Sequence, residues 1–248
     1  MKKLLILLCL PMIGFGQVTM IPDANFEQEL INLGYDFNLN GSVYTASIDT
    51  VTSLNVNGLN IADLTGIEDF ILLESLYCNG NYLHILDVSQ NTALTYLGCS
   101  HNLLTTLDVS QNTALTNLYC RYNQLTSLDV SNNTACGYLD CSYNQLTSLD
   151  MRNGNNMNMS NFYATDNPNL TCINVDNATW SFNNWTVANQ NIDLQHYFSN
   201  NCSGTLIEEH TTNKELLRTI DLLGRETTNN PLFYIYDDGT VEKRIVIE

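Results

Sequence analysis

Four segments of the chain repeat one pattern. Residues 76–88 read LYCNGNYLHILDV, residues 97–109 read LGCSHNLLTTLDV, residues 118–130 read LYCRYNQLTSLDV and residues 139–151 read LDCSYNQLTSLDM. Each segment begins 21 residues after the one before, and leucine, cysteine, asparagine and aspartate recur at equivalent positions. A fixed period of this length indicates a solenoid, in which each copy forms one coil and packs only against its neighbours.

The repeated unit resembles a known motif. Leucine-rich repeats follow the pattern L-x-x-L-x-L-x-x-N-x-L, and Leu73, Leu76, Cys78, Asn81 and Leu83 match it, with cysteine in the third leucine position. The resemblance implies an α/β-type solenoid that is mostly β, coiled to the right, with short parallel strands on its concave face. Residues 73–170 are expected to hold these repeats.

The segment before the repeats, residues 17–72, is expected to cap the solenoid. Asp23 is a good N-cap residue, Phe26, Leu30 and Leu33 fall on one helical face, and Gly34 suits a C-cap. The apolar end of a first coil needs a cover, because a solenoid otherwise exposes it to water. We therefore expect a short amphipathic helix at this end.

The pattern becomes irregular on both sides of the regular array. Residues 51–64 keep the apolar rhythm with degenerate spacing and are expected to form an atypical first repeat. After residue 150 the register slips, and Phe162, Ala164 and Asn167 then indicate a fifth, modified repeat. Residues 171–203 are aromatic and not periodic, and we expect a C-terminal cap there.

Charge restricts the classes of partner. Residues 17–203 contain only two basic side chains, Arg121 and Arg152, against 17 Asp and Glu residues, a formal balance of −15. Lys and Arg drive binding to phosphate backbones and anionic membranes. Nucleic acid and anionic membrane surfaces are therefore poor candidate partners, and neutral or cationic ligands are better ones.

The two ends of the chain predict export. Residues 1–16 combine Lys2 and Lys3, an apolar run and a small-residue end, which is typical of a signal peptide and too short to span a bilayer. No other stretch approaches 18 apolar residues, so no transmembrane segment is expected.

The C-terminal segment, residues 204–248, differs in kind from the repeats. A hairpin is expected around Asp238 and Gly239, between two apolar segments. The sequence of this segment also resembles the C-terminal sorting domain of the type IX secretion system of certain Gram-negative bacteria. That resemblance implies a β hairpin or sandwich-like segment, type IX machinery as a partner, and a secreted or outer-membrane-surface location. The matching residues are Asp221, Gly224, Arg225, Gly239, Lys243 and Arg244.

The cysteines of the repeats admit three interpretations: a metal site, disulfides or core. A zinc site needs four ligands around one ion, but a line of cysteines spread over successive strands cannot converge on a point. Stacked side chains about 4.8 Å apart are also too distant for unstrained disulfides. We therefore expect buried thiols and no metal, at Cys78, Cys99, Cys120, Cys136 and Cys141.

Three further features are assigned structural roles. Cys172 and Cys202 flank the C-terminal cap, and export favours a disulfide between them. The recurring asparagine is expected to bond the backbone groups of adjacent coils. The recurring aspartate, Asp87 in the first copy, is expected to accept from backbone N–H groups of the turn that follows it, with bound Ca²⁺ as a less favoured alternative.

The outward positions of the predicted strands carry the candidate binding site. Tyrosine alternates between two neighbouring columns from coil to coil, and such side chains suit peptides or sugar faces because they offer area and a hydroxyl at low entropic cost. The alternative is that tyrosine simply favours an exposed sheet. The candidate ligand-binding residues are Tyr77, Tyr96, Tyr119, Arg121, Tyr138 and Tyr163.

These features favour a binding protein over an enzyme. No G-x-S-x-G, H-E-x-x-H or phosphate-binding glycine loop occurs, and the histidines lie in unrelated contexts. No cofactor is expected. The preferred function is a secreted or cell-surface binding or adhesion module that recognises protein, peptide or glycan. The alternative is a structural surface protein without a defined ligand.

Overall fold

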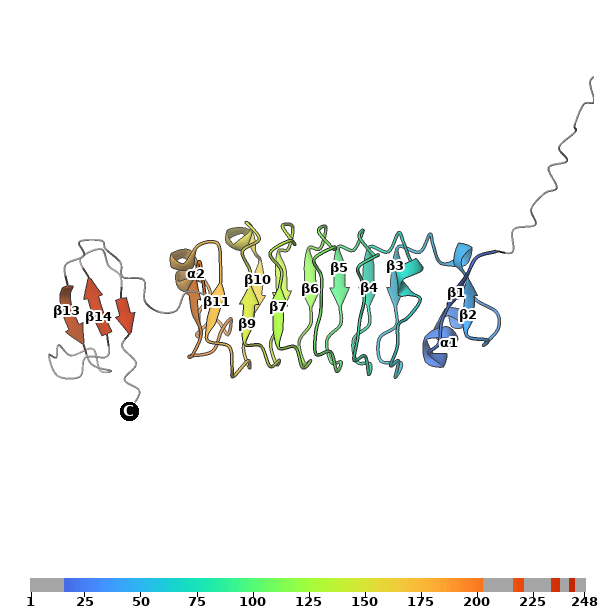
Figure 1. The fold of residues 1–248 in the computed structure, drawn as a ribbon, viewed down its shortest axis with the longest axis horizontal. Helices are drawn as coiled ribbons and strands as arrows, with labels where there is room; N and C mark the ends of the chain where they lie inside the picture. The colour runs from blue at the N-terminus through green and yellow to red at the C-terminus, as the bar shows by residue number, and fades with distance from the viewer. Residues whose placement is uncertain (1–15, 203–215, 221–232, 237–240, 244–248) are drawn as a thin grey trace, which may run out of the picture. The chain divides into compact units, whose positions relative to one another are not determined.

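The computed structural model describes residues 16–202, 216–220, 233–236 and 241–243, and the chain divides into two compact units, residues 1–203 and 204–248 (Figure 1). The predicted signal peptide, apart from Gly16, lies outside the described residues. So do all the sorting-domain residues except Lys243.

The first unit is a parallel solenoid built on a six-stranded sheet. The central residue of each strand is a leucine, or Phe162 in the last, and all six are fully buried. Neighbouring strands pair in parallel and in register, so that Leu97 lies between Leu76 and Leu118. The sheet therefore confirms the 21-residue register. Its strands, in spatial order, are β3 (Ser53–Asn55), β4 (Ser75–Tyr77), β5 (Tyr96–Gly98), β6 (Asn117–Tyr119), β8 (Tyr138–Asp140) and β10 (Asn161–Tyr163).

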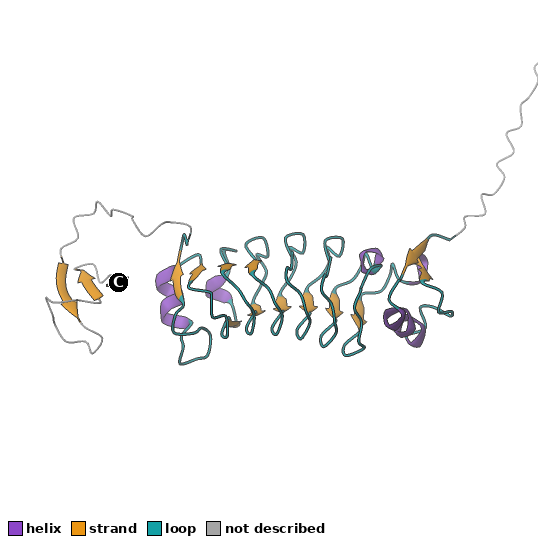
Figure 2. Ribbon diagram, turned by 60° about the horizontal axis from the view of Figure 1, so that its bottom comes forward, coloured by secondary structure: helices purple, strands orange, loops and turns teal. Residues whose placement is uncertain are grey.

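A second parallel sheet runs along another side of the coils (Figure 2). The sequence does not predict it, because the repeat pattern indicates only one strand in each coil, whereas this sheet adds a second strand from β7 onward, in the third of the four quoted copies. It also extends into residues 171–203, which the sequence assigns to a non-periodic cap. The coiling therefore continues further than the spacing suggests. The four strands are β7 (Ser127–Asp129), β9 (Ser148–Asp150), β11 (Cys172–Asn174) and β12 (Tyr197–Ser199).

An asparagine column ties successive coils together. The Nδ2 group of Asn123 donates to the carbonyl of Cys99 in the preceding coil and to that of Cys120 in its own, at 3.0 and 3.1 Å. Its Oδ1 accepts from the backbone N–H of Leu104 at 3.0 Å. Asn102 and its other equivalents repeat the arrangement, which satisfies backbone groups that the turn leaves without ladder partners. The column comprises Asn81, Asn102, Asn123, Asn144 and Asn167.

A second asparagine column stands on the other side of each coil and was not predicted. The Nδ2 group of Asn112 donates to the carbonyls of Val88 and Asn91, both at 2.9 Å, and Asn91 and Asn133 are bonded in the same way. All three side chains are fully buried, and their Oδ1 atoms have no hydrogen-bond partner. The signal was present in the sequence, since these asparagines also recur every 21 residues.

The repeat cysteines lie in the core as free thiols. Cys78, Cys99, Cys120, Cys136 and Cys141 are fully buried. Burial raises the pKa of the Cys99 thiol to about 12 and that of Cys136 to about 11. These thiols therefore stay protonated and pack as small apolar groups.

The N-terminal cap contains helix α1 (Ala24–Asn32) and an antiparallel pair, β1 (Val18–Met20) with β2 (Ser42–Tyr44). Asp23 caps the helix, because its Oδ1 accepts from backbone N–H groups of the first helical turn. Its Oδ2 accepts from the backbone N–H groups of Ala62 and Asp63 in the first coil. Phe26 and Leu30 are buried as expected, whereas Leu33 is 43% exposed, because the helix ends at Asn32 and the chain turns away at Gly34 (φ 81°).

A buried carboxylate orders the loop after this helix. Glu27 is 2% exposed, and its Oε1 accepts from the backbone N–H groups of Asn40, Gly41 and Ser42. Three short 3₁₀ helices complete the connections of the first unit, at Thr45–Ser47, Ile67–Asp69 and Asn156–Asn158.

The C-terminal end of the first unit is closed by aromatic packing and a disulfide. Helix α2 (Ala178–Asn184) places Trp185 against the ring of Phe162, with centroids 4.5 Å apart. The structure joins Cys172 and Cys202 by a disulfide, with a Cα separation of 5.8 Å. The sequence predicts this pair, and the bridge links strand β11 to the chain that follows strand β12.

The second unit contains a three-stranded antiparallel sheet of β13 (Leu216–Ile220), β14 (Phe233–Tyr236) and β15 (Val241–Lys243). Strands β14 and β15 form the expected hairpin. The sequence did not indicate β13.

Replacing Asn123 with alanine tests the asparagine column. We expect Asn123→Ala to lower the free energy of unfolding by roughly 2–4 kcal/mol, because each buried backbone group left unpaired costs about 1–3 kcal/mol. Denaturant unfolding followed by circular dichroism measures the change. The matched control is Asn132→Ala, which removes an exposed asparagine of the same coil and should change stability little.

A buried histidine predicts a pH dependence of stability. The His196 side chain has no exposed surface, its Nδ1 accepts from the backbone N–H of Asp193, and burial lowers its pKa from 6.5. The unfolded chain therefore binds this proton more readily. The contribution to stability is complete above pH 6.5 and declines as the pH falls below it towards the folded-state pKa.

Thermal unfolding at a series of pH values checks this expectation. His196→Gln should flatten the decline just below pH 6.5, whereas His84→Gln, at an exposed histidine, should retain the wild-type slope. The aspartates with lowered pKa values, such as Asp87 and Asp108, lose their contribution only near and below pH 3.8, in a separate range. Equal slopes for wild type and His196→Gln would contradict the assignment.

Candidate functional site

The outward face of the six-stranded sheet carries a continuous row of tyrosine rings. Successive ring centroids are 4.5, 5.3, 4.4 and 6.3 Å apart, although the residues alternate between the first and third positions of their strands. All five side chains are half-buried. We call this row the inner ladder; its members, in order along the solenoid, are Tyr77, Tyr96, Tyr119, Tyr138 and Tyr163.

Gly98 permits the ladder to be continuous. Tyr96 stands two residues along its strand from the position that aligns with Tyr77 and Tyr119, so its ring must lean across position 98 to stack between theirs. A Cβ atom at Gly98 would lie 3.2 Å from Cε1 of Tyr96 and 2.9 Å from Nδ2 of Asn79. The absent side chain therefore makes room for the ring.

Burial and neighbouring groups raise the pKa of two ladder phenols. Burial, with the neighbouring Tyr119 and Tyr77, raises the pKa of Tyr96. Burial, Tyr119 and the carboxylate of Asp140 together raise the pKa of Tyr138 to about 12. At physiological pH the hydroxyl groups of Tyr96 and Tyr138 are therefore uncharged and can donate and accept hydrogen bonds.

A second aromatic row lies beside the first, where the chain leaves the strands. His101 stacks on Tyr122 at 4.4 Å, and Tyr122 stacks on Tyr143 at 4.1 Å. All three residues have a left-handed backbone, with φ of 55°, 53° and 55°. These side chains are exposed, in contrast to the inner ladder. We call this row the outer stack.

Arg121 stands between the two rows. Its guanidinium carbon lies 4.7 Å from the ring centroid of Tyr122 and 5.6 Å from that of Tyr143, a cation–π arrangement. Its Nη1 is 3.8 Å from Oδ2 of Asp140, which is 6% exposed and also accepts from Ser142. The arginine thus offsets the buried carboxylate and holds the outer stack against the sheet.

The geometry determines what a ligand would touch. Rings that stack on one another cover their faces, so the interior tyrosines present edges and hydroxyl groups to solvent. Interior rings have a neighbouring ring on each side, and only the terminal rings of the two rows have a ring neighbour on one side alone. Stacking of sugar faces along the whole ladder, which the sequence alone permits, is therefore not available to the interior tyrosines.

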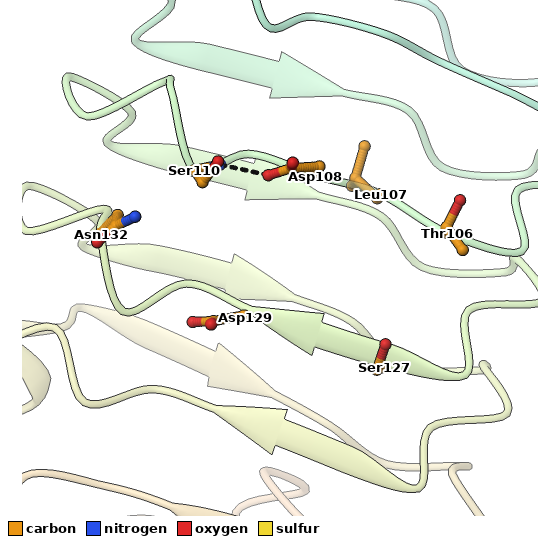
Figure 3. A pocket seen from close by; sticks show the side chains of 7 residues that line it. All are labelled: Thr106, Leu107, Asp108, Ser110, Ser127, Asp129 and Asn132. Carbon is orange, nitrogen blue, oxygen red and sulfur yellow. Dashed lines mark hydrogen bonds between the residues drawn. The ribbon is translucent and has the colours of Figure 1, made fainter.

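Two hollows lie away from the tyrosines, between adjacent coils. One, of about 310 Å³, lies between residues 106–110 and 127–132, and Figure 3 shows Asp108 and Asp129 within it. The other, of about 580 Å³, lies between residues 62–68 and 84–90. Asp108 and Asp129 accept from the backbone N–H groups of Ser110 and Ser131, as predicted for the aspartate column. One oxygen of each carboxylate is therefore bonded within its own turn.

Within the described residues, no group of histidine, cysteine or acidic side chains could hold a metal ion, and no helix is long and apolar enough to cross a membrane.

The structure brings all six predicted ligand-binding residues to one face, where the tyrosines form a single row. The site predicted from the sequence did not include the side chains of the outer stack. It also missed Gly98. Its signal was a glycine at a position where the neighbouring strands carry Tyr77 and Tyr119.

Comparison with known proteins identifies proteins that have a similar fold. No protein-family model matches the chain. A segment of 71 residues is 39% identical to internalin J of Listeria monocytogenes serotype 4b. This segment makes up 29% of this chain and 8% of that protein. The solved functional domain of InlJ from Listeria monocytogenes, described as including a cysteine ladder, superposes with a TM-score of 0.52 at 36% identity, over 64% of this chain and 38% of that one.

The fold is an internalin-like leucine-rich-repeat solenoid. This chain also carries a column of cysteines, which comprises Cys78, Cys99, Cys120 and Cys141. Another Listeria internalin, InlF, aligns at 19% identity with a TM-score of 0.45, over 63% of this chain and 56% of its own. The chain spans less than two thirds of the length of each of these proteins.

Substitution of Gly98 tests how the inner ladder is built. We expect Gly98→Ala to displace the Tyr96 ring, because the new Cβ would meet Cε1 at 3.2 Å. The pKa of Tyr96 should then fall towards 10, since burial and its two ring neighbours raise it. Spectrophotometric titration of the phenols measures this shift. Gly137→Ala is the control, because nothing lies within 4 Å of a Cβ there, and it should leave the titration unchanged.

Proposed function

We propose that this protein is a binding or adhesion module that engages a protein, peptide or glycan through the face formed by the inner ladder, Arg121 and the outer stack. The observation that carries the proposal is the extent of this face: aromatic side chains continue without interruption from β4 to β10. Tyrosine provides large, rigid contact area with a polar tip, the combination favoured in recognition surfaces. Solenoids present such a face as one surface.

The charge of the first unit supports a neutral or cationic partner. Arg121 is the one cationic side chain on this face within the described residues, and Asp140 already lies beside it. A polyanion would meet 17 acidic residues against two arginines in residues 17–203. Binding to nucleic acid is therefore not part of the proposal, and neither is catalysis.

Export is a separate part of the proposal. Residues 1–16 would act as a signal peptide, and residues 204–248 would act as a type IX sorting domain that delivers the protein to the surface of a Gram-negative cell or to the medium. The support comes from the sequence patterns at Lys2 and Lys3 and at Gly224 and Arg225. Mass spectrometry of the termini of the protein recovered from cells tests both cleavages.

One observation favours the alternative, a structural surface protein without a defined ligand. The tyrosine rings contact one another, so stacking alone could account for them as a stabilising element of an exposed sheet. A purely structural role predicts that replacing the rings lowers stability and changes no binding.

The two functions are separated by replacing Tyr96, Tyr119 and Tyr138 with serine together. We expect binding to fall at least about tenfold, because aromatic anchors carry most of the energy of such surfaces. Binding to a panel of peptides, glycans and matrix proteins is measured by biolayer interferometry, and circular dichroism checks the fold. Tyr82→Ser, at a 54% exposed tyrosine outside both rows, is the control. Unchanged binding by a folded triple variant would refute the role of this face.

A further inference from the structure

The outer stack is closed at one end and open at the other. Gly58, Gly80 and His101 occupy equivalent positions in successive coils. The backbone N–H group of each donates to a backbone carbonyl of the next coil, at 2.9 Å. His101 therefore has Tyr122 on one side and two glycines on the other. Neither glycine carries a side chain that could cover the second face of the imidazole.

The opposite end of the stack does not offer such a face. The position after Tyr143 in this column is Asp166, which also has a left-handed backbone, with φ of 57°. A side-chain hydrogen bond with Tyr122 is the main cause that raises the pKa of Tyr143, and the nearby Asp166 carboxylate raises it further. A charged group thus stands at this end, and the stack has one open ring face, on His101.

The space above the two glycines has the dimensions of a ring site. Coils of a parallel ladder lie about 4.8 Å apart, so two positions without side chains leave room for a ring on His101. A Cβ at Gly80 would find nothing nearer than Gly58, at 3.8 Å, and a Cβ at Gly58 would have nothing within 4 Å. We call this space, bounded by Gly58, Gly80 and His101, the His101 slot.

Two amide side chains are close to the slot in the sequence and bond each other. Asn57 and Asn79 directly precede the two glycines, and Nδ2 of Asn79 donates to Oδ1 of Asn57 at 3.0 Å. Oδ1 of Asn79 accepts from the backbone N–H of Ser100 at 2.8 Å, which fixes the amide orientation. Each Nδ2 group has two N–H bonds, so N–H donors of Asn57 and Asn79 remain for a ligand.

We propose that the His101 slot binds one neutral sugar unit of a glycan, with the C–H face of the sugar on the imidazole and its hydroxyl groups on the amides of Asn57 and Asn79. The inference rests on the proposed binding function and names the ligand of one part of that face. A pyranose ring has both an apolar face and a rim of hydroxyl groups, which matches one ring face beside amide donors. The acidic balance of residues 17–203 disfavours sugars that carry a carboxylate.

The chain itself supplies variants that should fold. The backbone conformation of this column already carries His101, Tyr122 and Tyr143, so Gly80→Tyr can extend the stack by one ring and fill the slot. Gly80→Asn is the matched control, because asparagine tolerates the left-handed conformation and adds no ring. His101→Asn removes the ring face, and His101→Tyr restores one.

The test uses the full chain on an array of neutral, sialylated and uronic-acid oligosaccharides, together with peptides that contain tryptophan or tyrosine. We expect binding to neutral oligosaccharides that Gly80→Tyr and His101→Asn weaken at least about tenfold, while His101→Tyr retains it. The chain has only 4 histidines, so the signals in NMR spectra of histidine-labelled protein can be assigned individually. We expect the His101 ring signals to shift when the oligosaccharide that binds is added, and the signals of His84 and His196 to stay unchanged.

The outcomes separate this inference from the proposed function. If the triple tyrosine variant loses binding and Gly80→Tyr does not, the face binds a ligand and the slot proposal is wrong. If binding depends on Gly80 only for aromatic peptides, or only for acidic sugars, the neutral-sugar assignment is wrong. If no probe on the array binds in a way that depends on Gly80, the slot is not a site.

Discussion

The asparagine column holds the coils of the solenoid in one register, and the rest of the structure depends on that register. Each buried amide bonds backbone groups of its own coil and of the coil before it. The turn after each strand leaves these groups without ladder partners, and they lie too deep for water. Because the same residue makes the same bonds in every coil, a slip of one residue would leave several buried groups unpaired at once.

That register converts a sequence period into a surface. Residues 21 positions apart become neighbours across parallel strands, so the leucines and cysteines line the core while the tyrosines line the opposite side of the same strands. The cysteines are the most conspicuous part of the repeat, yet burial leaves them protonated and chemically quiet. The outward side chains alone are available to a partner.

The aromatic face combines stability and recognition in the same rings. Stacking half-buries the tyrosines and makes the row rigid, and burial keeps the hydroxyl groups of Tyr96 and Tyr138 protonated. Rigid side chains lose little entropy on binding. The same stacking limits what they can contact, since interior rings offer edges and hydroxyl groups and only the ends of the rows offer faces. Arg121 links the outer stack to strand β8 through its contacts with Tyr122 and Asp140.

The sequence by itself determined the coil, its parallel strands, the buried cysteines and the face on which the tyrosines lie, because each follows from a 21-residue period and the alternation of side chains along a strand. It could not predict the second sheet, because the strands β7, β9, β11 and β12 depend on how neighbouring coils pack on one another. Nor could it show that Tyr96 leans over Gly98, or that Gly80 leaves one face of His101 uncovered. Those features come from side-chain directions and from empty space between coils, which the tertiary structure alone decides.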